Sequence, residues 1–160
     1  MKQNWKRTLQ GALLGAALLA MAGCGSTNVM DTYSFGHQVI RAGQSEITIA
    51  LPYEMGKSTK NMSDKGYPID IYGSVTEHMV IEVEALRPGE NKPLPTVDEY
   101  INHSKSEFAK VGATIKEESV ALEGASAKKL DVTVTSQGQI FRISQYVFLD
   151  HGVLWNIVYQ

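Results

Sequence analysis

The stretch LPTVDEYINHSKSEFAKVGATI, residues 94–115, decides the fold because it predicts the main helix of the chain together with both of its ends. Thr96 and Glu99 have the spacing of a capping box, in which each side chain bonds to the backbone near the other residue. Gly112 suits the position after a helix, where a positive φ is common. Residues between these ends recur at three- and four-residue spacing as one stripe: Val97, Tyr100, Ile101, Ser104, Phe108 and Val111. A single amphipathic helix of this kind needs a sheet to cover.

The chain after this helix supplies strands for that sheet. Four segments rich in β-branched and aromatic residues follow one another, at 115–122, 127–135, 140–149 and 153–159. Gly124, Gly138 and the sequence Asp150-His151-Gly152 lie between them and are typical of hairpin turns. Leu130 and Val132 lie two residues apart and therefore share one face. We predict a four-stranded antiparallel meander.

The chain before the helix predicts further strands. Residues 47–51 alternate large and small side chains and end at Pro52, and Val39 with Ile40 predicts a shorter strand before them. Residues 54–66, with Met55 and Met62, are mostly polar, which predicts a long loop.

Residues 67–72 and 79–86 predict an antiparallel hairpin with its turn at Gly73-Ser74. The second strand alternates two sets of side chains. Met79, Ile81, Val83 and Ala85 form an apolar face, and Val80, Glu82, Glu84 and Leu86 are expected to form a face that is mostly exposed to water.

These elements predict one α+β domain over residues 32–160. It contains an antiparallel sheet of about six or seven strands packed against one main amphipathic helix. A composition of 43% hydrophobic and 20% charged residues is typical of a folded chain of this size.

The first 23 residues predict an export signal. Lys2, Lys6 and Arg7 form a positive end, an apolar run follows, and Ala22-Gly23 supplies the small residues that signal peptidases require. The alternative is a transmembrane helix, but the uncharged stretch from residue 8 to 23 is shorter than the roughly 20 residues needed to cross a bilayer.

Cys24 is the only cysteine in the chain, and it directly follows this signal. The sequence Met21-Ala22-Gly23-Cys24 resembles the bacterial lipobox, with Met in place of the usual Leu. The resemblance implies that Cys24 carries a diacylglyceryl group and becomes the new amino terminus. The alternative for an odd cysteine in an exported protein is a free or disulfide-forming thiol. We therefore predict a signal peptide over 1–23 and a flexible tether over 24–31.

If Cys24 is lipidated, the membrane is the first predicted partner of the protein. In enterobacterial sorting an Asp after the cysteine retains a lipoprotein in the inner membrane, whereas Gly25 would let it reach the outer membrane. In an organism with one membrane the same signal places the domain on the outer face of the cytoplasmic membrane.

A longer resemblance covers most of residues 45–160. The segments SEITIALP, LPTVDEYINHSKSEFAKVGATI, VALEGASAKKLDVTV and QYVFLDHGVLWNIVY, in this order, resemble the PsbP/DcrB-like family of small exported domains. Leu122, Gly124 and Ala127 lie close to the Leu-x-Gly-x-x-Ala turn of that family. The resemblance implies an antiparallel sheet with helices against it and a non-catalytic role. The family normally adds a helix after the final strand, whereas this sequence stops at Gln160, so either the C-terminal helix is missing or the sequence is a fragment of a longer chain.

The charge pattern argues against nucleic acid as a partner. Without residues 1–23 the formal charge changes from −2 to −5, because three of the 15 basic residues and none of the 17 acidic ones lie there. Phosphate contacts need clustered Lys and Arg, and the basic residues here form no long run.

Residues suited to catalysis or metal binding are scattered. His37, His78, His103 and His151 lack the spacing of a metal-binding motif, so we expect surface or turn positions and no metal or cofactor. Two carboxylate pairs, Glu117 with Glu118 and Glu82 with Glu84, are expected to be solvated rather than catalytic. Aromatic side chains of the last two strands line either a core or a ligand pocket, and a core is the commoner outcome: Tyr146, Phe148, Trp155 and Tyr159.

The sequence leaves three classes of function open. The leading hypothesis is a membrane-anchored envelope lipoprotein that acts as a non-catalytic binding or assembly module for an envelope protein or a small ligand. The second is an envelope hydrolase that depends on Glu117, Glu118 or His151. The third is the small-ligand-binding subunit of a transport system, which usually needs two lobes, whereas this chain predicts one.

Overall fold

The computed structural model describes residues 35–52, 56–58, 67–75 and 79–160. The predicted signal peptide, Cys24 and the tether lie outside the described residues, as do Met55, Met62 and His78.

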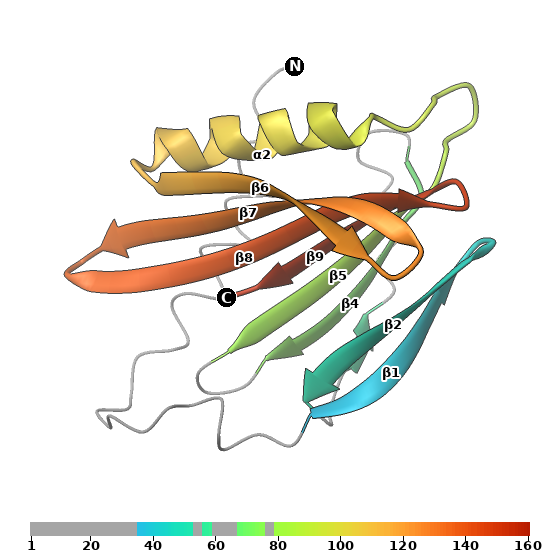
Figure 1. Ribbon diagram of the computed structural model, residues 1–160, viewed down its shortest axis with the longest axis horizontal. Helices are drawn as coiled ribbons and strands as arrows, with labels where there is room; N and C mark the ends of the chain where they lie inside the picture. Colours follow the sequence, from blue (N-terminus) through green and yellow to red (C-terminus); the bar gives the residue numbers. More distant parts are fainter. Residues whose placement is uncertain (1–34, 53–55, 59–66, 76–78) are drawn as a thin grey trace.

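Seven strands form one antiparallel sheet, in the order β3-β4-β5-β9-β8-β7-β6 (Figure 1). Their bounds are β3 Gly56–Ser58, β4 Ile69–Val75, β5 Val80–Leu86, β6 Thr114–Leu122, β7 Ala125–Ser136, β8 Gln139–Asp150 and β9 Val153–Tyr159. The predicted meander of β6 to β9 and the β4–β5 hairpin are confirmed. The final strand β9 pairs with β5, so it joins the two halves of the chain at the centre of the sheet.

Two details of the sheet differ from the sequence prediction. Gly73 and Ser74 belong to strand β4, which continues to Val75, because both residues pair with β5 instead of forming the turn. The segment predicted as a long loop contains the short strand β3, and its other residues lie outside those that the structure describes.

Strands β1, Phe35–Ala42, and β2, Ser45–Pro52, form a separate two-stranded sheet. The prediction that the 47–51 strand belongs to the main sheet is therefore wrong. The β1–β2 hairpin lies across one face of the main sheet, which we call the hairpin face (Figure 1). Its Gly43 has a φ of +57° in the turn between the strands, a conformation that glycine adopts without strain.

Helix α2, Val97–Lys110, lies on the opposite side of the sheet, which we call the helix face (Figure 1). The capping box is confirmed, since Glu99 N–H donates to Thr96 Oγ1 at 3.2 Å and Thr96 N–H donates to the Glu99 carboxylate at 2.7 Å. Gly112 has a φ of +71° after the helix, as predicted. Val111 is the exception to the predicted stripe, because it is 49% exposed at the end of the helix.

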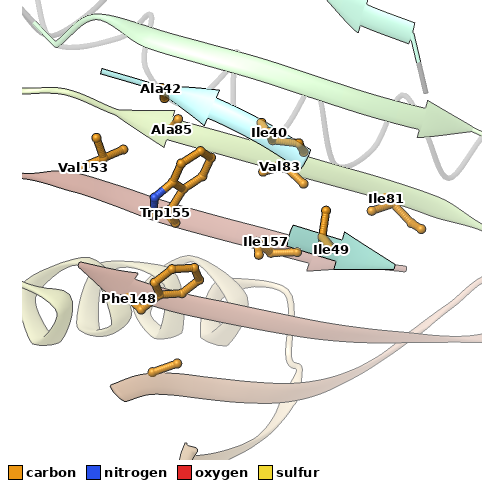
Figure 2. Packing of buried hydrophobic residues seen from close by; sticks show 11 residues of the cluster. Ile40, Ala42, Ile49, Ile81, Val83, Ala85, Phe148, Val153, Trp155 and Ile157 are labelled. Atoms are coloured by element: carbon orange, nitrogen blue, oxygen red, sulfur yellow. The ribbon is translucent and has the colours of Figure 1, made fainter. Parts of the chain in front are cut away.

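Each face of the sheet has its own apolar core. On the hairpin face, Trp155 is fully buried, and Figure 2 shows it at the centre of a cluster that includes Ala85, Val153 and Phe148. Ile40 and Ile49 of the hairpin belong to this cluster, and Figure 2 shows Ile40 beside Val83 and Ile49 beside Ile157. On the helix face, α2 packs against β6, β7 and β8. The buried core there also includes residues of β5 and β9, and its members are Leu86, Ile101, Phe108, Leu130, Val132, Ile143, Val147 and Leu154. The coarse prediction of an α+β fold, with an antiparallel sheet and one main helix, holds for the described residues.

Candidate functional site

The most distinctive polar cluster lies on the helix face, around Glu84 of β5. Its Oε2 accepts a hydrogen bond from the Tyr100 hydroxyl at 2.9 Å and another from Asn156 Nδ2 at 2.8 Å. The two donors come from α2 and from β9, so the carboxylate connects the helix to two central strands. The expectation that Glu82 and Glu84 face open water is wrong, because both are half-buried and Leu86 of the same face is in the core.

The cluster continues across the sheet through two amides. Gln145 Nε2 of β8 donates to Asn156 Oδ1 at 2.8 Å and to Ser104 Oγ of α2 at 3.2 Å. Gln145 and Asn156 are buried, at 4% and 5% exposure. Gln145 Oε1 is buried without a hydrogen-bond partner among the described residues, which leaves an acceptor for one more donor. We call Glu82, Glu84, Tyr100, Ser104, Gln145 and Asn156 the polar network.

Burial changes the acidity of two members of this network. Burial raises the pKa of Glu82 to about 7, and the charge of Glu84 and a hydrogen bond with its carboxyl act in the same direction. Burial, followed by the charge of Glu84, raises the pKa of the Tyr100 hydroxyl well above its ordinary value. A carboxyl group with a pKa near 7 can bind and release a proton close to neutral pH.

The sequence contained a weak signal for this network. Asn156 is the only polar residue in the strand VLWNIVY, and a polar side chain in a buried strand needs a partner. The partner, Glu84, is 72 residues away in sequence. Only the pairing of β5 with β9 brings the two together, so the sequence pattern by itself did not identify them as neighbours.

The second predicted carboxylate pair is divided between the two faces. Neighbouring residues of a strand point to opposite sides, and in β6 Glu117 pairs with Lys105 of α2 at 2.7 Å, whereas Glu118 pairs with Lys129 of β7 at 3.1 Å. Hydrogen bonds from these lysines lower the pKa of both glutamates. Glu117 and Glu118 therefore do not share a proton or converge on one substrate atom.

The described histidines are exposed and separated. His37 lies in β1, His103 in α2 and His151 in the turn between β8 and β9. No group of three or more possible metal-ligating residues occurs in the described part of the chain. None of the described helices has the length and apolar character needed to cross a membrane.

A second hydrogen-bonded group lies on the hairpin face, and the sequence reasoning missed it. Trp155 Nε1 donates to the Ser45 hydroxyl at 2.8 Å, and this hydroxyl donates to the Asp150 carboxylate. The other Asp150 oxygen bonds to His151 Nδ1 at 2.8 Å. These bonds from Ser45 and His151 lower the pKa of Asp150.

This group contains the residue types of a catalytic triad in an order that does not activate the serine. A triad places the histidine between the serine and the aspartate, so that the imidazole receives the hydroxyl proton. Here Asp150 lies between Ser45 and His151, and Ser45 is only 2% exposed. The group instead attaches the turn of the β1–β2 hairpin to the end of the main sheet.

The aromatic side chains of β8 and β9 divide into two pairs. Phe148 and Trp155 are buried in the core, as expected. Tyr146 and Tyr159 are half-buried and pack edge to face, with ring centroids 6.1 Å apart. Lys129 lies 5.7 Å from the Tyr146 ring and also bonds to Asp131, which satisfies its charge locally.

Comparisons with solved structures find distant structural similarity. No family model matches the chain, and no curated protein matches it. The chain is similar to a crystal structure of PA94, a protein of unknown function from Pseudomonas aeruginosa, with 14% sequence identity and a TM-score of 0.40. The similarity covers 77% of this chain and 81% of the other.

Proposed function

We propose that the protein is a lipid-anchored component of the bacterial cell envelope that acts as a non-catalytic binding or assembly module. The observation that carries this proposal is the sequence Met21-Ala22-Gly23-Cys24 directly after a basic and then apolar segment. One acyl chain binds a bilayer reversibly, whereas two or three hold a protein there. A lipidated Cys24 would thus be a sufficient anchor, in the outer membrane or on the outer face of the cytoplasmic membrane.

The arrangement of the domain supports a non-catalytic role. Glu117 and Glu118 point to opposite faces, and Ser45 is buried at the turn end of the β1–β2 hairpin with its hydroxyl bonded to Asp150. These are the residues that an acid–base or nucleophilic mechanism would need to bring together. Each of these side chains bonds to a neighbouring side chain, so each has a structural role in the fold.

The order of elements supports a related proposal on the fold. An opening hairpin, two paired strands, a capped helix and a four-stranded meander follow one another in the described chain. This is the order expected of a PsbP/DcrB-like domain, and we propose that assignment. The resemblance implies that bacterial members of that family are envelope lipoproteins, and this would agree with an anchor at Cys24.

A second candidate function is an envelope hydrolase, and one observation favours it. Glu82 and Glu84 are close together, and burial raises the pKa of Glu82 to about 7, which suits a general acid. If such an activity is found, replacing Glu82 with Gln should abolish it. Replacing Glu118 with Gln should leave it unchanged.

The anchor is tested by the mass of the full chain expressed in a bacterium and extracted from its membranes. The wild-type mass should correspond to loss of residues 1–23 and addition of a diacylglyceryl group at Cys24. The Cys24→Ser variant should lack this modification. An unlipidated wild-type product would contradict the anchor and redirect the search to a soluble exported protein or one anchored by a helix.

The binding role is tested by photocrosslinking from the anchored protein. Ile140 and Leu149 are 65% and 52% exposed, so a photoreactive residue at either site leaves the core intact. A specific partner should give one adduct of defined mass from one position, lost in the Cys24→Ser protein. Adducts with abundant lipoproteins alone, from both positions, would count against a specific module.

A further inference from the structure

We propose that Glu82 and Glu84 form a proton-dependent contact that controls how firmly the first half of helix α2 is held against the sheet. This inference concerns the folded domain and does not rest on the proposed membrane anchor. It depends on the position of the two carboxyl groups within the polar network.

The two glutamates lie two residues apart on β5 and therefore on one face. Glu82 is opposite Gly73 of β4 and Val158 of β9, and Glu84 is opposite Ile71 and Asn156 on the same two strands. None of these four neighbours is titratable. No Lys, Arg or His among the described residues forms an ion pair with either glutamate.

Among the described residues, helix α2 contributes one titratable group that bonds to the pair, the Tyr100 hydroxyl. It donates to Glu84, and burial together with the charges of the glutamates keeps it protonated. From β8 the network receives Gln145, which is neutral. The pair is thus surrounded by neutral donors and apolar groups, and these stabilise one negative charge better than two.

Protonation of Glu82 is consistent with this environment. The neutral carboxyl can donate its hydrogen to Glu84, whose Oε2 accepts from Tyr100 and Asn156. When Glu82 loses its proton to water, two carboxylates repel each other in a half-buried layer where the described residues place no paired cation. Moving Glu84 away relieves the repulsion, and it breaks the bond to Tyr100 near the start of α2. Phe108 continues to hold the second half of the helix through apolar contacts.

The direction of the pH dependence follows from the two pKa values of Glu82. Its pKa is about 7 in the folded protein and 4.5 as an ordinary glutamate. Between these values the folded state binds more protons than the unfolded state, so stability falls as the pH rises. The contribution is complete below pH 4.5 and is lost above pH 7.

The test is amide hydrogen exchange of the full chain at pH 5.5 and pH 8.5, corrected for intrinsic exchange. Protection of residues 97–103 should fall at the higher pH by about tenfold to 30-fold, because pH 5.5 lies about 1.5 units below the Glu82 pKa of about 7. The Glu82→Gln variant should lose most of this pH dependence. The matched Glu118→Gln variant, a carboxylate on the opposite face, should keep it.

Two outcomes would overturn the inference: wild-type protection of α2 that does not depend on pH, and equal pH dependence in the two variants. If Glu82→Gln does not fold, urea unfolding of the wild-type chain between pH 4.5 and 7.5 decides the question. Stability should decrease over this range. A constant or increasing stability would contradict a carboxyl group that holds its proton more tightly in the folded state.

Discussion

The two faces of the sheet are covered in different ways. On the hairpin face, the β1–β2 hairpin encloses an apolar cluster around Trp155, and Ser45 and Asp150 form hydrogen bonds at one end of it. On the helix face, α2 covers an apolar core at β6 to β8, but the polar network extends under its first half to β5 and β9. The first face is built for firm attachment, whereas the second contains a group that titrates near neutral pH.

This difference has an energetic basis. Apolar burial contributes stability that does not change with pH, because apolar side chains bind no protons. A buried carboxyl pair changes its contribution with each proton that it binds or releases. The helix face is therefore the better candidate for a response to the surroundings, and the following substitutions test the comparison in order of expected effect.

The largest effect is expected from Trp155→Ala. This residue is fully buried, and truncation of a large aromatic side chain in a core costs about 3–5 kcal/mol. Urea unfolding followed by circular dichroism measures the loss. Trp155→Phe should cost clearly less, because it keeps most of the apolar surface and loses only the bond to Ser45. Equal losses of stability in the two variants would contradict the prediction that the Trp155 ring stabilises the fold by packing at the centre of the cluster.

A smaller effect is expected from Ile101→Ala on the helix face. Ile101 is 1% exposed beneath α2, and its truncation should cost about 2–4 kcal/mol. The same unfolding experiment measures it. Val111→Ala serves as the control, since this side chain is half exposed and should change stability little. A comparable loss in the control would mean that the C-terminal end of α2 is buried.

The attachment of the hairpin is tested by Ser45→Ala. The substitution removes the acceptor of Trp155 Nε1–H and the donor to Asp150, and a buried unsatisfied polar group costs about 1–3 kcal/mol. Fluorescence of Trp155 in the processed protein reports the change directly, because the only other tryptophan, Trp5, lies in the predicted signal peptide. Unchanged emission and unchanged stability would show that the apolar contacts alone hold the hairpin.

The smallest effect is expected at the start of the helix, from Thr96→Ala. Loss of an N-cap side chain costs about 1 kcal/mol. The change should appear as a small decrease in the urea midpoint. Ser106→Ala, at an exposed position inside the same helix, should be neutral or slightly stabilising, because alanine favours the helix. If Ser106→Ala lost as much stability as Thr96→Ala, the effect would come from removing a hydroxyl group from the helix and not from removing the cap.

The elements with local signals were predicted well. The helix and its cap follow from Thr96, Glu99 and Gly112, and the meander follows from turns such as Gly138. Errors arose where the outcome depended on distant segments. The strand of residues 47–51 was placed in the main sheet, and Glu82 and Glu84 were placed in water, because strand alternation does not reveal what covers each face.

The candidate site was predictable only in part. Sequence reasoning singled out Glu82 and Glu84 as a pair, and their spacing correctly placed them on one face. It did not identify Tyr100, Gln145 or Asn156 as their neighbours. Those contacts span 11 to 72 residues of sequence and depend on the pairing of β9 with β5 and β8 and on the position of α2 over the sheet.

The sequence by itself determined the segments of this protein: a predicted export signal with a lone cysteine at Cys24, a capped amphipathic helix, and strands separated by glycine turns. These are properties of neighbouring residues, since capping, turn geometry and periodicity act over a few positions. Only the tertiary structure decided that β9 lies between β5 and β8, that a separate hairpin covers Trp155, and that Glu84 meets Tyr100 and Asn156. Burial and charge at these positions depend on contacts between distant parts of the chain, which local patterns do not contain.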